Sequence, residues 1–369
     1  MKLPVRLSAA AVAALLLLSP AAQALTPDQA RALLDNFYVD PVPQQVLDQP
    51  TVPDMLRALG DPYTQYFTAE DYAAFSASLS DVYQVGAGLS LVAADGGLLV
   101  RRVIPGSAAE AGGLCAGDIV TAVDGRPLVG LSLEEASGLM TGQAGSTFQL
   151  TYLRAGQPCT VTLTRRAFVV PTAYAELVDD HIGYLTCDAF GGETTSHVSQ
   201  ALETYGDQAD RWILDLRDNG GGNLDAALQT ITCFTGPNDR LAYLMQQNGA
   251  LSAEGGQSRQ QNDDPLIVLT NRFSASASEL FAAAIRDTGS GLLVGDRTYG
   301  KGVAQILLDD SLFPECFSEG DALKITAYRF YGPAGTSNDT AGVMPHLLVE
   351  QDLADEVAVL LSAPAPRTN

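Results

Sequence analysis

The stretch over residues 265–305, PLIVLTNRFSASASELFAAAIRDTGSGLLVGDRTYGKGVAQ, constrains the fold of this chain more than any other. Residues 265–269 are a short apolar run of branched side chains that suits a buried strand, and residues 271–274 supply turn and capping residues. From about Ser276 towards Ile285, apolar residues at spacings of three and four make one face of a helix. The stretch therefore predicts a strand, a turn and a helix with a cluster of serines at the helix start.

These serines have two interpretations. Ser274, Ser276 and Ser278 are favoured helix-capping residues, and capping alone would explain them. However, unsatisfied backbone N–H groups at a helix start stabilise negative charge, so a serine there also lies beside a ready-made oxyanion site. Such a serine needs a base within hydrogen-bond reach before it can act as a nucleophile.

Lys301, which lies between Gly300 and Gly302, could be that base. An ionised lysine cannot accept a proton, so its pKa would have to fall from about 10.4 to about 7, and that demands a largely buried site. The alternative is a solvated loop lysine, which is the usual environment of this residue type.

The motifs NRFSASASE and VGDRTYGKGVAQ resemble the active-site region of the C-terminal processing peptidases, also called tail-specific proteases. The resemblance implies that Ser276 is the nucleophile, Lys301 the base and Gln305 a supporting residue. Contact between Lys301 and Gln305 requires a bent or compact backbone, because a fully extended strand would separate their Cα atoms by about 13 Å. A plain strand would leave Gln305 as an ordinary sheet residue.

A second segment fits the same family. Residues 212–216, WILDL, predict a strand, and the RDNGGGN that follows allows the backbone to approach a ligand closely. The resemblance implies an oxyanion hole made by the amide of Gly221 or Gly222 together with that of Ala277. Gly220 stands where the family pattern has another residue before the glycine pair. The sequence therefore does not decide whether Gly221 or Gly222 is the oxyanion-hole donor. A flexible strand-to-helix loop is the alternative.

Residues 82–168 are typical of a separate β-rich module with one short helix. The strings VGAGLSL and VIPGSAAEAGGLCAGDIVTAVDGRPL resemble a PDZ domain of the bacterial protease type. Such domains bind a peptide as an added strand and hold its terminal carboxylate with loop amides. The resemblance places the carboxylate at Gly86, Ala87, Gly88 and Leu89, with the peptide along residues 89–92. A purely structural turn, with the groove elsewhere, is the alternative.

The first 24 residues predict a signal peptide. Lys2 and Arg6 precede an apolar run over residues 7–18, and Ala22-Gln23-Ala24 is a small-residue cleavage pattern. We expect an extracytoplasmic protein, secreted, periplasmic or associated with the cell envelope, with no stable membrane span after cleavage. An uncleaved membrane anchor is the alternative. The net charge of −22 argues against nucleic acid as a partner, because the chain would repel phosphate.

The sequence contains no motif that is typical of a metal or cofactor site. Its five cysteines show neither a C-x-x-C pair nor metal-ligand spacing, which favours buried free thiols over disulfides. The three histidines are scattered and carry no motif, so a histidine-based triad is the poorer choice. We expect neither a metal nor a cofactor.

The sequence therefore predicts a mixed α/β protein. We expect a signal peptide (1–24), a helical N-terminal region (25–81), a PDZ domain (82–168) and a serine peptidase core (169–369), whose fold the resemblance implies is similar to crotonase and the ATP-dependent protease ClpP. The expected function is an exported serine endopeptidase that recognises the free C-termini of protein or peptide substrates. The resemblance also implies that the PDZ domain can hold the core inactive until peptide binds.

Two other functions remain as alternatives. One is a catalytically silent PDZ scaffold, and the other is a crotonase-like acyl-transfer enzyme that uses the oxyanion hole. A homo-oligomer and a regulatory partner protein are both compatible with the sequence.

Overall fold

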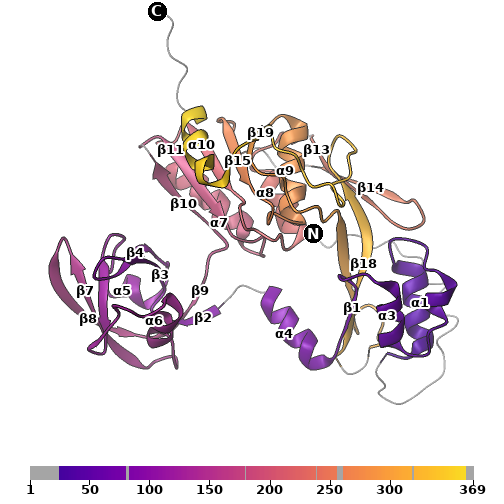
Figure 1. Ribbon diagram of the computed structural model, residues 1–369, viewed down its shortest axis with the longest axis horizontal. Coiled ribbons are helices and arrows are strands. Elements are labelled where there is room, and N and C mark those ends of the chain that lie inside the picture. Colours follow the sequence, from indigo (N-terminus) through magenta and orange to yellow (C-terminus); the bar gives the residue numbers. More distant parts are fainter. Residues whose placement is uncertain are drawn as a thin grey trace, which may run out of the picture. The chain divides into compact units, whose positions relative to one another are not determined.

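The computed structural model describes residues 25–79, 83–178, 180–237, 239–255, 261–317 and 320–362. The predicted signal peptide lies outside these residues. The chain divides into two compact units, one that joins the residues up to 79 with those from 172 onward, and one over residues 80–171 (Figure 1). The N-terminal helical region therefore shares a unit with the peptidase core.

A six-stranded sheet is the centre of the first unit in the described part of the chain. Its first two strands are antiparallel, and every later neighbour pair is parallel. In spatial order the strands are β10 (Ala173–Val178), β11 (Ile182–Cys187), β12 (Arg211–Asp215), β15 (Leu266–Thr270), β16 (Leu292–Gly295) and β19 (Leu347–Leu348). The strands predicted around residues 212–216 and 265–269 are confirmed as β12 and β15.

Both faces of this sheet are buried, which explains why its central strands are continuous apolar runs. Trp212 and Leu214 face one core, whereas Ile213 faces another, as the two-residue period of a strand requires. The first core is completed by three helices, α7 (Thr194–Tyr205), α8 (Leu224–Ile231) and α9 (Ala277–Thr288). The second is completed by α10 (Ala354–Ser362), which follows the 3-10 turn η1 (Gln351–Leu353).

Helix α9 lies between this sheet and a second sheet. Its Phe281 belongs to the first core, while its Leu280 packs with Leu244 and Phe330 of the second sheet. In that sheet β18 (Ala322–Tyr331) pairs with β1 (Gln65–Phe67), β13 (Arg240–Met245) and β17 (Val303–Leu308), and β13 also pairs with β14 (Leu251–Gly255). Helix α9 confirms the helix predicted from about residue 276, and its burial on both sides fixes the position of its N-terminus.

The N-terminal helices cover the second sheet. Leu33, Leu34 and Met55 are buried in one cluster with Leu323 and Ile325 of β18. Pro27 opens the first helix and Thr26 caps it, as expected for residues with these preferences. The helices are α1 (Pro27–Phe37), α2 (Gln44–Leu47), α3 (Val52–Leu59) and α4 (Ala69–Leu79). Within the described ranges, no helix has both the length and the apolar character needed to cross a bilayer.

The second unit is a β-sheet module with its own core, and the predicted boundaries 82–168 lie within it. Ser132 and Glu135 form the predicted capping box at the start of α6 (Leu133–Met140). The main sheet runs in the order β3 (Leu89–Ala94), β4 (Gly97–Val103), β5 (Ile119–Val123), β7 (Thr147–Arg154) and β8 (Gln157–Thr164), with β6 (Arg126–Pro127) beside β5. The remaining elements are α5 (Ala108–Ala111) and the pair β2 (Tyr83–Gly86) and β9 (Arg166–Val169).

Candidate active site

Four of the candidate site residues lie on loops that leave three neighbouring parallel strands. The loop after β12 carries Gly221 and Gly222, the loop after β15 carries Ser276, and the loop after β16 carries Lys301. Carboxyl ends of parallel strands meet at one edge of a sheet, which is where open α/β folds bind their ligands. Three segments separated in sequence are thereby brought together.

Ser276 has an unusual backbone conformation. It directly precedes α9, and its φ of 56° and ψ of −114° lie in a region that L-residues rarely adopt. Such a conformation costs about 1–3 kcal/mol and persists only where the surroundings impose it. The neighbouring serines have a different environment, because both are buried and hydrogen-bonded. Ser274 Oγ donates to the Leu216 carbonyl (2.7 Å) and Ser278 Oγ to the Asn219 carbonyl (2.9 Å).

The glycine loop packs directly against the loop that carries Ser276. The Ala275 N–H donates to the Asn219 carbonyl (3.0 Å), and Gly221 has a φ of 104°. A Cβ atom at Gly221 would lie 2.9 Å from both Ser276 Cβ and the Ala277 nitrogen, so only glycine fits there. The Gly221 N–H donates to Asn219 Oδ1 (2.8 Å), whereas the N–H of Ala277, the first residue of α9, has no acceptor inside its own helix.

Glu279 joins the loop that carries Ser276 to the loop that carries Lys301. Its side chain is fully buried, and one carboxylate oxygen accepts from the backbone N–H groups of Ser276 and Lys301, both at 2.8 Å. The other oxygen accepts from the Gly300 N–H and the Thr298 hydroxyl, both at 2.7 Å. This residue was not predicted from the sequence, although the Ser-x-x-Glu spacing of a capping box from residue 276 indicates it.

The contact expected between Lys301 and Gln305 is present. Lys301 Nζ donates to Gln305 Oε1 at 2.9 Å, and Gln305 Nε2 donates in turn to Thr326 Oγ1 at 3.2 Å. A β-bulge between Ala304 and Gln305 bends β17 where it pairs with β18. The segment is therefore bent rather than a plain strand.

Lys301 is partly buried, and burial is the main cause that lowers the pKa of its ammonium below the ordinary value. The positive charge of Lys324 lowers this pKa further, while Asp61 and Glu279 raise it. Between these described side chains no hydrogen bond links Ser276 Oγ to Lys301 Nζ. The structure thus brings both loops to one carboxylate without a hydrogen bond between the two side chains.

A model of peptidase family S41 matches residues 181–349, and a PDZ domain model matches residues 99–154. The carboxyl-terminal-processing protease of Picosynechococcus sp. is 31% identical to this chain over 82% of it and 72% of the relative. The chain belongs to the carboxyl-terminal-processing proteases of family S41. The protease of the same name from Synechocystis sp. is 30% identical over 87% of this chain and 75% of its own.

The fold agrees with this family. A solved structure of a photosystem II D1 C-terminal processing protease is similar to the chain with a TM-score of 0.55 and 26% identity, over 92% of this chain and 97% of the other. The chain is a serine-type peptidase with a mixed α/β core, a PDZ domain and a helical N-terminal region, as the sequence analysis expected.

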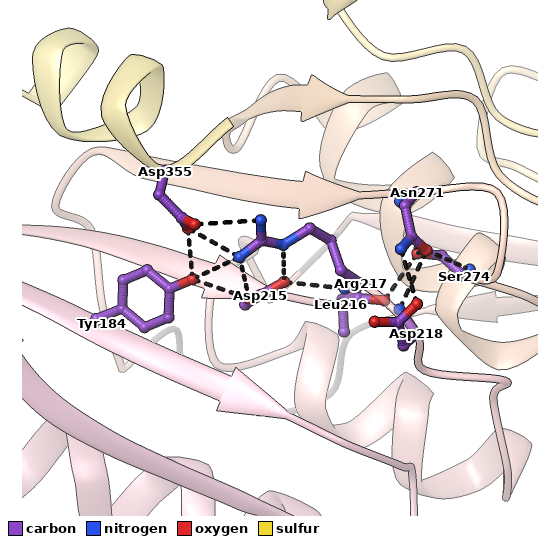
Figure 2. A network of polar contacts seen from close by, with 8 residues as sticks. All are labelled: Tyr184, Asp215, Leu216, Arg217, Asp218, Asn271, Ser274 and Asp355. Carbon is purple, nitrogen blue, oxygen red and sulfur yellow. Dashed lines mark hydrogen bonds and ion pairs between the residues drawn. The ribbon is translucent and has the colours of Figure 1, made fainter. Parts of the chain in front are cut away.

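In this protease an ion-pair network supports the strand that leads into the glycine loop (Figure 2). Arg217 donates two hydrogen bonds to the Asp215 carboxylate, at 2.9 and 2.7 Å, and also donates to Asp355 at 2.8 Å. The Tyr184 hydroxyl donates to Asp215 Oδ2 at 2.8 Å. Because Asp355 belongs to α10, the network ties the C-terminal helix to the residues that immediately precede Asp218.

Asp218 connects the same strand end to the segment that leads to Ser276. Its N–H donates to Asn271 Oδ1 at 3.1 Å, and Asn271 Nδ2 donates to its carboxylate at 2.9 Å (Figure 2). Asn271 is the first residue after β15, so this pair bridges the ends of two neighbouring strands. Neither Arg217 nor Asn271 was singled out from the sequence.

In the PDZ unit, the proposed carboxylate loop precedes a strand at the edge of its sheet. Gly86 ends β2, Gly88 has a φ of 77°, and Leu89 begins β3. The carbonyl groups of Ala87 and Gly88 are hydrogen-bonded, to Ala109 N–H at 2.8 Å and Ile104 N–H at 2.9 Å. β3 pairs with β4 and is the last strand on its side of the described sheet.

The cysteines require one correction. All five are unpaired, and Cys187, Cys233 and Cys316 are buried as expected, but Cys115 is exposed and Cys159 half-buried. Both lie in the PDZ unit, whose small core leaves more of its residues near the surface. Over the described ranges, no three histidine, cysteine, aspartate or glutamate side chains gather as a metal site would require.

Proposed function

We propose that this protease is an exported endopeptidase that captures the free C-terminus of a substrate in its PDZ domain and cuts the chain with Ser276, Lys301 and Gln305. One observation carries the proposal. A serine in a strained backbone conformation and a partly buried lysine are attached through their backbone amides to the same carboxylate oxygen of Glu279. Glu279 is a positioning residue in this proposal.

In the reaction, Ser276 Oγ attacks the scissile carbonyl carbon while neutral Lys301 Nζ accepts its proton. The negative charge that forms on the carbonyl oxygen is stabilised by the N–H of Ala277 and by that of Gly221 or Gly222. Gly221 serves only if its N–H leaves Asn219 Oδ1. The Lys301 ammonium then protonates the leaving amine, and water hydrolyses the acyl-enzyme by the reverse proton path.

Gln305 holds the base in place through its hydrogen bond to Nζ. Its own amide is fixed by Thr326, so the orientation of Lys301 depends on β18. The absence of a hydrogen bond between Ser276 Oγ and Lys301 Nζ fits a resting state, because catalytic hydrogen bonds often tighten only when substrate binds. We include in the proposal that peptide binding to the PDZ domain promotes this closure.

The PDZ domain would bind its peptide as an added strand along β3, with the terminal carboxylate at the amides of residues 86–89. The edge position of β3 and the positive φ of Gly88 support this assignment. A peptide with a free C-terminus should bind more tightly than its amidated form in a calorimetric titration. Equal affinities would remove the carboxylate role.

Export is part of the proposal and rests on the signal-peptide pattern of residues 1–24. The mature chain should then begin at Leu25, and mass spectrometry of the exported protein tests this directly. Recovery of a chain that keeps residues 1–24 would favour the membrane-anchored alternative.

The activity is tested with an unstructured protein that ends in an apolar, free C-terminus. The parent should cleave it, and the Ser276→Ala variant should bind but not cleave. If neither protein cleaves while both bind, the silent-scaffold alternative holds. A Ser278→Ala variant is the matched control, because that hydroxyl is engaged with the Asn219 carbonyl.

A further inference from the structure

A second lysine, Lys324, lies on the same side of β18 as the residues that hold Lys301. Thr326 pairs with Gln305 across β17 and β18 and accepts its hydrogen bond. Residues two apart on a strand share a face, so Lys324 projects towards the side of the sheet on which Gln305 meets Thr326. Its ammonium Nζ is held 4.9 Å from the Phe75 ring centroid and 5.2 Å from that of Phe67.

The segment before β1 also packs against Lys301 and β18. The Tyr63 ring centroid lies 4.4 Å from Lys301 Nζ, and Thr64 Oγ1 accepts a hydrogen bond from the Thr326 N–H at 3.0 Å. Asp61 fixes this segment, since its carboxylate accepts from the Tyr63 N–H at 2.9 Å and from the Thr64 hydroxyl at 2.6 Å. A segment more than 200 residues earlier in the chain therefore forms part of the surroundings of the base.

Among the described residues, the charges that shift the pKa of Lys301 come from three elements. Lys324 on β18 lowers its pKa, whereas Asp61 on the N-terminal segment and Glu279 on α9 raise it. Burial raises the pKa of the Tyr63 phenol, and contact with Tyr299 raises it further, so Tyr63 adds no charge beside Lys301 at neutral pH. The pKa of Lys324 is itself lowered by burial and raised by Asp61. Lys324 is therefore the like charge that opposes protonation of Lys301.

We propose that Lys324 is a positioning residue for the peptidase reaction, an ammonium held by aromatic rings beside Lys301 that keeps the base in its neutral form, with Asp61 acting in the opposite sense. The inference rests on the proposed role of Lys301 as the base. Lys324 touches no reacting atom and acts only through Lys301.

The test is the pH profile of kcat/KM on a short fluorogenic peptide, measured with the full mature chain. In the Lys324→Met variant the acid limb should move to higher pH by about one unit, because the like charge is gone. Activity well below the limb should fall about tenfold, and the two profiles should converge at high pH. The Lys324→Arg variant keeps the charge, so its limb should stay at the parent's pH or move lower.

The Asp61→Asn variant provides a shift of opposite sign. It retains an oxygen that can accept from the Tyr63 N–H but removes the negative charge, so its acid limb should move to lower pH. Should Lys324→Met fail to fold, the Lys324→Arg and Asp61→Asn profiles decide the question. An acid limb that stays in place when either charge is removed overturns the inference, as does an equal loss at every pH in Lys324→Met and Lys324→Arg.

Failure of the proposed function is distinguishable from failure of this inference. If Lys301 is not the base, a Lys301→Ala variant will retain turnover, whatever residue 324 is. If Lys301→Ala is inactive and the profiles still do not move, only the role of Lys324 is wrong.

Discussion

The two halves of the candidate active site are held in different ways. The nucleophile loop, residues 271–278, is fixed by short contacts to the neighbouring strand end, with Ser274 and Ser278 bonded to backbone carbonyls. The amine of Lys301 is instead placed by Gln305 and Tyr63, and its pKa is shifted by the charges of Lys324, Asp61 and Glu279. The first arrangement fixes the position of the Ser276 side chain, and the second controls the protonation state of Lys301.

The two halves should therefore be sensitive to different changes, the first to displacement of atoms and the second to changes in charge and burial. A serine nucleophile needs its oxygen placed within tenths of an ångström, which buried backbone contacts achieve. A lysine base needs desolvation and suitable neighbours, which no local sequence can supply. Glu279 connects the halves because it accepts hydrogen bonds from both backbones.

The largest effect is expected at Ser276. Ser276→Ala and Ser276→Gly should each lower kcat/KM by at least about 10⁴-fold, because the nucleophile is lost. The two should differ in stability, since glycine accepts a φ of 56° without strain and should raise the free energy of unfolding by about 1 kcal/mol over alanine. Urea titration measures this. A glycine variant less stable than the alanine variant would show that the backbone there is not strained.

The lysine half should respond next most strongly. Lys301→Met should lower kcat/KM by about 10³-fold, which is within the range for loss of a general base. Steady-state kinetics on the fluorogenic peptide checks this. Loss of less than tenfold would mean that another group takes the proton.

The same variant tests the burial of Lys301 through pH-dependent stability. The pKa of Lys301 is lower in the folded than in the unfolded protein, so the unfolded chain binds more protons between those two values. The parent should therefore gain stability as pH rises from the folded pKa towards about 10.4, and Lys301→Met should lack this gain. Parallel stability curves for parent and variant would contradict a buried lysine.

Glu279→Gln should have an intermediate effect. The amide NH₂ group would face backbone donors, and we expect a loss of about 2–3 kcal/mol of stability together with a fall of about 10–100-fold in kcat/KM. The matched control is Glu135→Gln, since Glu135 forms the same type of capping box with Ser132 at an exposed helix start. That variant should leave both stability and activity nearly unaltered, because this box lies in water.

The smallest effects are expected at the flanking serines. Ser274→Ala and Ser278→Ala should each cost about 1–2 kcal/mol of stability, since a buried carbonyl loses one of its two hydrogen-bond donors. Their kcat/KM should stay within about tenfold of the parent. If Ser278→Ala is completely inactive while its thermal unfolding is unchanged, the nucleophile is Ser278 and not Ser276.

Local patterns predicted one half of the site better than the other. The strand, turn and helix around Ser276 follow from apolar runs and capping residues that are adjacent in sequence. For Lys301 and Gln305 the sequence predicted only that contact requires a bent backbone. The bulge in β17 provides that bend. Glu279 was missed because a capping glutamate is ordinarily exposed, whereas this one lies between two sheets.

The surroundings of Lys301 could not be predicted from the sequence. Tyr63 and Asp61 reach the lysine because β1 pairs with β18, a contact between segments more than 200 residues apart. The segment was expected to be structural, and no local pattern indicates which distant strand it will join. The network from Arg217 to Asp355 was missed for the same reason.

The central claim is that Ser276 is a nucleophile activated by Lys301. Its most direct test is covalent labelling by a fluorophosphonate, followed by mass spectrometry of the digested protein. We predict one label per chain, on Ser276, and a labelling rate about 10³-fold lower in Lys301→Met, with Ser274 and Ser278 unmodified. Labelling of another serine, or an unchanged rate in Lys301→Met, would contradict the account.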